Sequence, residues 1–288
     1  MKRILILGSA GMAGHVVKKR LSDSGKYIIG DLARTTAASE FTYNVDVTDL
    51  NALDHAISAF NPDMIINCIG VLNRDAEENP DKAVLLNSFL PHHLARKATT
   101  AGGRLIHIST DCVFSGEKGN YNDTDAKDGI GFYAQSKALG EVTYGAHLTI
   151  RTSIVGPEMK TTGIGLLHWF LRNEAKEIKG YTHAYWGGIT TIQLAIAIEH
   201  AIEQPVSGLI HLTNGIRISK YQLVSIFKDV FQKDVLIKPD DSYKVDKSLA
   251  PSINTKLLGN VPSYEEMVHE MKSWMQENRN FYCNNYKY

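Results

Sequence analysis

The chain has 288 residues, 43% apolar and 22% charged, which suits one large domain or a nucleotide-binding domain with a smaller partner. Its 31 lysines and arginines balance 31 aspartates and glutamates, so no net field attracts nucleic acid or an anionic membrane. No apolar run reaches the roughly 20 residues of a membrane-spanning helix, and three scattered cysteines indicate neither a disulfide framework nor a metal site. A cytoplasmic protein without a bound metal is therefore expected.

The first half of the chain alternates short apolar runs, rich in β-branched residues, with longer stretches of helical periodicity. Apolar side chains recur every three or four residues in these stretches, as in residues 53–60 and 86–94. Such alternation is typical of a parallel sheet with helices on both faces. We therefore predict an α/β fold, a doubly wound sheet of Rossmann type in residues 1–151, with strands at 4–7, 27–29, 64–68, 104–108 and 148–150.

Beyond residue 151 the pattern is less regular. It predicts a smaller mixed lobe over residues 152–288 that binds the substrate, with some of the chain crossing back to the first domain. The last predicted helix is followed by a polar tail, so we expect residues 277–288 to be poorly ordered. The predicted elements are helices at 165–174, 192–203, 220–231 and 264–276 and a strand at 209–212.

A glycine-rich turn directly follows the first predicted strand and opens a helical pattern. Its glycines are spaced as G-x-x-G-x-x-G, from Gly8 through Gly11 to Gly14. Glycine permits a close approach of the backbone, and a helix N-terminus offers unpaired N–H groups to a pyrophosphate. The turn therefore predicts a dinucleotide site that contains Gly8, Ser9, Ala10, Gly11, Met12 and Gly14.

The residues after the second predicted strand bear on the choice between NAD and NADP. Asp31 lies near the offset of about 20 residues at which a carboxylate contacts the adenosine ribose, and a carboxylate repels a 2′-phosphate. Arg34 instead favours NADP, because it can pair with that phosphate, with Thr35 and Thr36 as hydrogen-bonding neighbours. NAD(H) and NADP(H) both stay open, with NADPH preferred.

A tyrosine and a lysine are placed for proton transfer. Tyr133 and Lys137 are four residues apart and share one face of a predicted helix. A free tyrosine has a pKa of about 10, and a nearby ammonium lowers it by stabilising the phenolate. Thr110 follows the strand predicted at 104–108, and ligands of open α/β sheets bind beyond the carboxyl ends of strands. Thr110, Tyr133 and Lys137 are therefore the predicted catalytic residues.

Four motifs occur in a fixed order. They are Gly8-x-x-Gly11-x-x-Gly14, Ser109-Thr110-Asp111-Cys112-Val113-Phe114-Ser115-Gly116, Tyr133-x-x-Ser136-Lys137-x-x-Gly140-Glu141 and Arg151-Thr152-Ser153. Together they resemble the extended short-chain dehydrogenase/reductases, and within these the dTDP-4-dehydrorhamnose reductase type. The similarity extends over most of the chain.

The resemblance implies NAD(P)H-dependent reduction of the 4-keto group of a dTDP- or UDP-linked 4-keto-6-deoxy sugar, for surface polysaccharide or glycan synthesis. Tyr133 would donate the proton, Lys137 would tune its pKa and hold a ribose hydroxyl, and Thr110 would polarise the carbonyl. The expected partners are the nucleotide sugar and a second copy in a homodimer, without nucleic acid or membrane. Further cofactor contacts are implied for Asp46, Val47, Cys68, Ile69 and Gly70, and substrate contacts for Asp111, Cys112, Val113, Ser153 and Trp186.

The sequence departs from related families at two positions. Sugar-nucleotide 4,6-dehydratases carry a glutamate after the aspartate, whereas Asp111 is followed by Cys112, which argues against water elimination. The rhamnose-type reductases usually have an aromatic residue where this chain has Ile154, which leaves the sugar open. Cys112 also leaves an epimerase-reductase open, with His168 or His183 opposite the thiol; the alternative is a small buried residue.

A third alternative belongs to a different class of protein. Some proteins similar to these reductases bind the dinucleotide without turnover and serve as redox sensors or regulate another enzyme. They often lose the tyrosine or the lysine, and both are present here. The adjacent His92 and His93 cannot both face one way on a helix, and no third ligand is evident, so no metal site is predicted.

Overall fold

A parallel sheet forms the centre of the molecule in the computed structural model, which describes residues 1–35 and 40–286. Seven strands lie in the order β10-β6-β5-β4-β1-β2-β3, and every neighbouring pair is parallel. The predicted α/β fold class is confirmed. The strands are β1 (Lys2–Leu7), β2 (Tyr27–Ala33), β3 (Thr42–Asn44), β4 (Met64–Asn67), β5 (Arg104–Thr110), β6 (Leu148–Thr152) and β10 (Gly208–His211).

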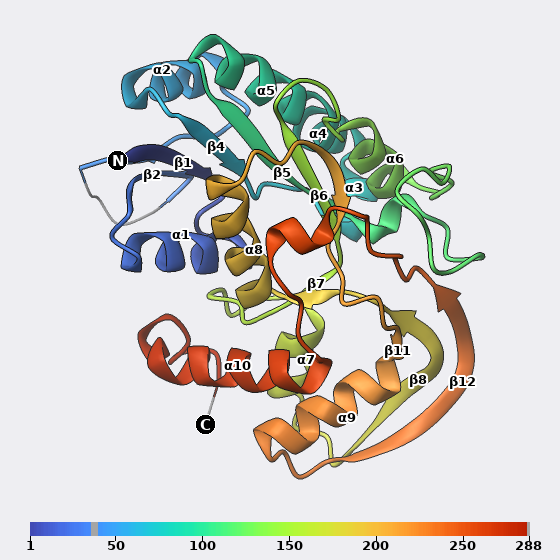
Figure 1. Ribbon diagram of the computed structural model, residues 1–288. Helices are drawn as coiled ribbons and strands as arrows, with labels where there is room; N and C mark the ends of the chain where they lie inside the picture. The colour runs from blue at the N-terminus through green and yellow to red at the C-terminus, as the bar shows by residue number, and fades with distance from the viewer. Residues whose placement is uncertain (36–39, 287–288) are drawn as a thin grey trace.

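Both faces of this sheet are covered by helices (Figure 1). Successive side chains of a strand point to opposite faces, so Ile4 belongs to one core cluster and Leu5 to the other, and both are fully buried. This explains why the strands are continuous apolar runs. One face is covered by α1 (Gly14–Asp23) and α8 (Thr191–Glu203), and the other by α2 (Leu50–Phe60) and α5 (Leu90–Thr100).

The connections near the carboxyl ends of the strands contain short helices. The helical pattern predicted around residues 86–94 is two elements, because a π-helix precedes α5 and begins at Val84. These elements are α3 (Asn73–Glu78), α4 (Pro80–Ala83), the π-helix η1 (Val84–Phe89), the 3₁₀ turn η2 (Asp111–Val113) and α6 (Phe132–Leu139).

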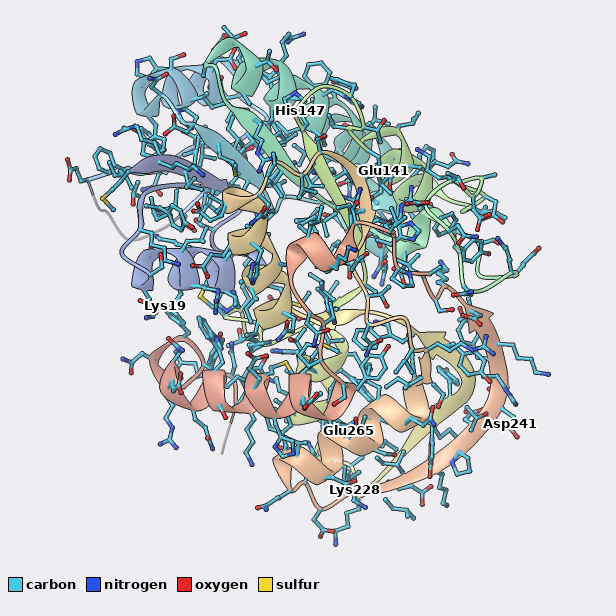
Figure 2. All side chains as sticks on the ribbon, in the orientation of Figure 1. Lys19, Glu141, His147, Lys228, Asp241 and Glu265 are labelled. Carbon is cyan, nitrogen blue, oxygen red and sulfur yellow. The ribbon has the colours of Figure 1, made fainter. Side chains whose placement is uncertain are left out.

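The second half of the chain forms a smaller part built on a mixed three-stranded sheet. Its central strand β8 (Glu177–Trp186) pairs parallel with β12 (Leu236–Asp246) and antiparallel with β11 (Ile218–Ser219). Figure 2 shows Asp241 at the outer edge of this sheet and Lys228 on the helix beside it. The remaining elements are β7 (Ile154–Val155), β9 (Ile189–Thr190), α7 (Leu166–Arg172), α9 (Lys220–Phe231), η3 (Thr255–Leu258), α10 (Tyr264–Glu277) and η4 (Arg279–Phe281).

The two halves share a core. Strand β10 comes from the second half and completes the central sheet beside β6. One cluster of buried side chains runs from Val16 on α1 through Phe227 on α9 to Met271 on α10.

The polar tail is packed, so the prediction that residues 277–288 are poorly ordered is wrong for its described part, which ends at residue 286. Tyr282 is fully buried and Tyr286 is 7% exposed, and both belong to the main core cluster. Their hydroxyls have buried hydrogen-bond partners in His15 and His168. Aromatic side chains with satisfied hydroxyls order a segment that composition alone marks as polar.

Candidate functional site

A cleft of about 980 Å³ opens beyond the carboxyl ends of β1, β2 and β4. The chain order along the sheet reverses at β1, between β4 and β2, and ligands of open α/β sheets bind at such a switch point. The predicted cofactor residues that line this cleft are Gly8, Ala10, Gly11, Arg34, Asp46, Val47, Cys68, Ile69 and Gly70.

The glycine-rich turn has the geometry that a phosphate cradle requires. Gly8 has a φ of +78°, which favours glycine, and a Cβ at Gly14 would lie 2.2 Å from the carbonyl oxygen of Gly8. Helix α1 begins at Gly14, so its free N–H groups adjoin the turn. Three other predicted residues of the turn are not among those that line the cleft, namely Ser9, Met12 and Gly14. The cradle fits a dinucleotide pyrophosphate.

Asp31 does not line the cleft. Strand β2 continues to Ala33, so Asp31 lies within the strand rather than at its end, and its side chain is buried. Its carboxylate accepts hydrogen bonds from Ser9 and Thr42, each at 2.9 Å, and pairs with Lys18. The carboxylate therefore ties the phosphate loop to the sheet instead of facing an adenosine ribose.

Arg34 and Thr35 come directly after β2 and do line the cleft. Arg34 is exposed and has no ion-pair partner among the described residues, whereas Arg74 and Lys82 in the same cleft pair with Glu78 and Asp75. Thr36 lies outside the described residues. Lys160 and Ile164, from the second half of the chain, also line the cleft.

The three predicted catalytic residues come together beside this cleft. Thr110 ends β5, and its hydroxyl donates to Asp111 at 3.2 Å and lies near the Tyr133 phenol. Helix α6 has no capping side chain of its own; instead Glu77 of α3 accepts the N–H groups of Phe132 and Tyr133 at 3.1 Å. Lys137, one turn along α6, donates to the carbonyl of Ile108 at 2.7 Å.

In the chain without a bound dinucleotide, burial and the neighbouring Cys112 raise the pKa of the Tyr133 phenol, which the nearby Thr110 hydroxyl only partly offsets. That Lys137 lowers this pKa in the complex stays a prediction. Burial also lowers the pKa of Lys137 to about 8. The lysine is held by the backbone of β5, and Tyr133 remains protonated at neutral pH, as a proton donor must be.

A buried histidine adjoins Lys137. The Asn67 side-chain amide contacts His107 Nδ1 at 3.1 Å, and Nε2 of the same ring lies 3.5 Å from Lys137 Nζ. Burial and the lysine keep the pKa of His107 well below its usual value, so the ring is neutral. Neither residue was predicted from the sequence, although a histidine and an asparagine inside apolar strands are an available signal.

A buried ion pair supports the strand that carries Thr110. The Glu141 carboxylate accepts two hydrogen bonds from Arg151, at 2.8 and 2.6 Å, and one from Ser109, which directly precedes Thr110. Arg151 also contacts His211 of β10. Glu141, labelled in Figure 2, follows α6, so the pair connects the tyrosine helix to three strands of the sheet. This role of Glu141 and Arg151 was not foreseen from the motifs.

The predicted substrate residues divide into two groups. Asp111, Cys112 and Ser153 lie near Thr110: the backbone N–H of Cys112 donates to the Thr110 hydroxyl at 3.2 Å, and Asp111, whose pKa is raised by burial, lies close to Ser153. Val113 is fully buried in a cluster with Phe114, and Trp186 is largely buried with its indole N–H on Ser153 at 3.0 Å. Val113 and Trp186 are therefore packed in the protein interior next to the site.

The structure does not support a proton-abstracting role for Cys112. Burial and Asp111 raise the pKa of its thiol to about 11, so it stays protonated at neutral pH. His168 is buried and bonds to Tyr286, while the exposed His183 lies 3.9 Å from Asp241 on the outer sheet. In the described part of the chain, neither histidine is hydrogen bonded to Cys112.

Other candidate residues have structural partners. His92 contacts Tyr144, and His93 contacts Asp54. In the described part of the chain, no three His, Cys, Asp or Glu side chains are grouped so that they could hold a metal ion. A search of the same residues finds no helix with the length and apolar character that would span a membrane.

Comparison with known proteins agrees with this geometry. The fold and the tyrosine–lysine helix define an extended short-chain dehydrogenase/reductase fold, and dTDP-4-dehydrorhamnose reductase from Bacillus anthracis, solved in complex with NADP, shares it with a TM-score of 0.82. That likeness covers 95% of this chain and 99% of the other at 21% identity. The chain belongs to the RmlD substrate binding domain family, whose model matches residues 1–277. The resemblance drawn from the motifs is confirmed.

Two kinds of curated relatives match. dTDP-4-dehydrorhamnose reductase from Aggregatibacter actinomycetemcomitans is 29% identical over 250 residues, 82% of this chain and 82% of the relative. Methionine adenosyltransferase 2 subunit beta from Bos taurus is 26% identical over 252 residues, 80% of this chain and 72% of the relative. The chain is thus similar both to proteins named as reductases and to proteins named as subunits of another enzyme.

Proposed function

We propose that the chain catalyses NADPH-dependent reduction of the 4-keto group of a nucleotide-activated 4-keto-6-deoxy sugar. The observation that carries the proposal is the closeness of the Thr110 and Tyr133 hydroxyls at the end of β5, beside the dinucleotide cleft and with Lys137 on the same helix as Tyr133. Two hydroxyls held together at the carboxyl end of a strand can both bond to one ketone oxygen.

The proposed mechanism assigns each step to these side chains. The reduced nicotinamide, when bound, supplies the hydride for the carbonyl carbon. Tyr133 gives its phenolic proton to the carbonyl oxygen, so the ketone becomes an alcohol. Thr110 holds that oxygen in place. The Lys137 ammonium stabilises the phenolate that remains and is positioned by the carbonyl of Ile108.

The preference for NADPH rests on charge. Arg34 and Lys160 are cations that line the cleft and have no ion-pair partner within the described ranges, and Asp31 is turned into the protein. A 2′-phosphate placed beside Arg34 can therefore pair with its guanidinium. The NADP in the Bacillus anthracis reductase supports the same choice.

The proposed sugar-nucleotide substrate rests on the family to which the chain belongs. The relative from Aggregatibacter actinomycetemcomitans is named for a dTDP-linked 4-keto sugar, so a dTDP- or UDP-linked substrate is proposed, with Asp111, Cys112 and Ser153 nearest the reacting groups. The test is NADPH oxidation with a panel of dTDP- and UDP-4-keto-6-deoxy sugars. We expect Tyr133→Phe to lower kcat by about a hundredfold or more, the typical worth of a proton donor. Equal turnover in Tyr133→Phe and the parent would disprove the mechanism.

A regulatory subunit is the second candidate, favoured by the methionine adenosyltransferase relatives. The neighbouring Thr110 and Tyr133 hydroxyls and the buried Lys137 favour the enzyme, because a protein that does no chemistry has no need of them. NADPH binding without turnover on any sugar of the panel would support the subunit instead.

Further assignments belong to the same proposal. Residues 1–151 would hold the dinucleotide and residues 152–288 mainly the sugar nucleotide. A homodimer is supported by apolar side chains left exposed on the adjacent η1 and α6, namely Phe89, Phe132 and Leu139. A cytoplasmic location is supported by the three cysteines, all of which are free.

A further inference from the structure

The segment that follows α10 contributes three largely buried polar side chains, Tyr282, Asn285 and Tyr286. Helix α10 packs against α8, and α8 packs against α1, the helix that opens from the phosphate loop (Figure 1). The segment therefore lies at the back of the dinucleotide cleft without lining it.

One arm of the segment reaches the phosphate loop through a chain of hydrogen bonds. His15 Nδ1 lies 2.8 Å from the carbonyl oxygen of Gly11, which only accepts, so Nδ1 carries the proton. Burial lowers the pKa of His15 to about 4, so the ring is neutral and Nε2 is an acceptor. Tyr282 donates to that nitrogen at 2.7 Å and accepts from the indole N–H of Trp274 at 3.1 Å.

Other side chains of the segment reach a second loop that lines the cleft. The Tyr286 hydroxyl accepts the N–H of Glu158 at 2.9 Å and contacts His168 Nδ1 at 2.9 Å, and Asn285 donates to the carbonyl of Glu158 at 2.6 Å. The Glu158 carboxylate in turn accepts the N–H of Gly165 at 2.7 Å, which closes residues 158–165 into a loop. That loop carries Lys160 and Ile164, which line the cleft.

We propose that residues 282–286 act as a clasp that presets two segments lining the dinucleotide cleft, with Tyr282 positioning Gly11 and with Tyr286 and Asn285 positioning the loop of Lys160. A loop held in its binding conformation before the ligand arrives loses less entropy on binding. The clasp therefore sets the affinity for the dinucleotide and leaves the chemical step to Thr110, Tyr133 and Lys137. This inference rests on the proposed dinucleotide binding.

The experiment is titration of the full chain with NADPH, combined with steady-state kinetics. Tyr282→Phe removes one hydroxyl and is expected to raise the Kd and the KM for NADPH about five- to tenfold, the worth of roughly one hydrogen bond, with little change in kcat. Tyr27→Phe is the matched control. Its hydroxyl is also bonded, to Glu203, but Tyr27 begins β2 at the opposite end of the sheet. We expect Tyr27→Phe to lower the Tm comparably and to leave the Kd unchanged.

A double-mutant cycle separates positioning from a general loss of stability. If Tyr282 acts through His15, Tyr282→Phe adds nothing to the Kd of His15→Leu, and Tyr286→Phe likewise adds nothing to Lys160→Ala. Additive effects would overturn the clasp. So would an unchanged Kd in Tyr282→Phe while the parent binds NADPH. A parent that does not bind NADPH would overturn the proposed function and the clasp together.

Discussion

Glu141 and Arg151 form a buried ion pair with two hydrogen bonds, next to β5, the strand that ends at Thr110. Nε and Nη2 of the arginine donate to the two carboxylate oxygens at 2.8 and 2.6 Å, and Arg151 is only 1% exposed. The pKa of Glu141 stays below its usual value despite burial, because Arg151 and Ser109 stabilise the carboxylate. The same carboxylate thereby fixes the backbone next to Thr110.

Breaking this pair is expected to unfold or strongly destabilise the protein. Glu141→Gln leaves an uncompensated buried guanidinium, and removal of one partner of a buried pair typically costs about 3–5 kcal/mol of unfolding free energy. Urea denaturation measures this loss. Lys127→Met is the control, because Lys127 lies 3.2 Å from the same carboxylate but is 38% exposed, so we expect a small change. A Glu141→Gln protein as stable as the Lys127→Met protein would contradict the assignment.

Arg34 is expected to select NADPH over NADH. Arg34→Ala should weaken NADPH binding by about tenfold to a hundredfold, the typical worth of a charge-assisted hydrogen bond to phosphate, and should leave NADH binding nearly unchanged. Titration of parent and variant with both dinucleotides measures the ratio. Arg74→Ala is the matched control, since Arg74 lines the same cleft but is paired with Glu78. An equal loss of both dinucleotides in Arg34→Ala would show that Arg34 does not read the 2′-phosphate.

The central sheet was predictable because its signals are local. Strands such as β1 are buried on both faces and are therefore apolar throughout, and α9 begins and ends where its periodicity predicted, at Lys220 and Phe231. Strand β12 was missed because its side chains are largely exposed and polar and it contains Pro239. Strand β8 was missed because its buried positions, Gly180 among them, alternate with exposed polar ones. Each is a strand because it pairs with the other, more than fifty residues away in the chain, and no local pattern records that pairing.

The candidate site also combines local features that could be predicted with long-range contacts that could not. The spacing of Tyr133 and Lys137 and the glycines of the phosphate loop are local features, and the structure brings them together. The surroundings of Asp31 were not predictable, because Ser9, Lys18 and Thr42 reach its carboxylate from three other elements. The packed segment after α10 left a signal that was overlooked, since Tyr282 and Tyr286 are aromatic residues in an otherwise polar stretch.

The activity is expected to fall as the pH rises through about 8. Burial lowers the pKa of Lys137 to about 8, with Glu141 and Cys68 opposing the shift, and His107 is the neutral group that faces it from β5. The ammonium is the form that stabilises the Tyr133 phenolate, so the active form is fully present below this pKa and is lost above it. The profile of kcat/KM against pH should therefore have an alkaline limb near pH 8. Lys137→Arg, whose guanidinium stays charged, should move this limb to higher pH even if the activity is lower. A limb at the same pH in Lys137→Arg and the parent would assign it to another group and remove Lys137 from the proposed proton transfer.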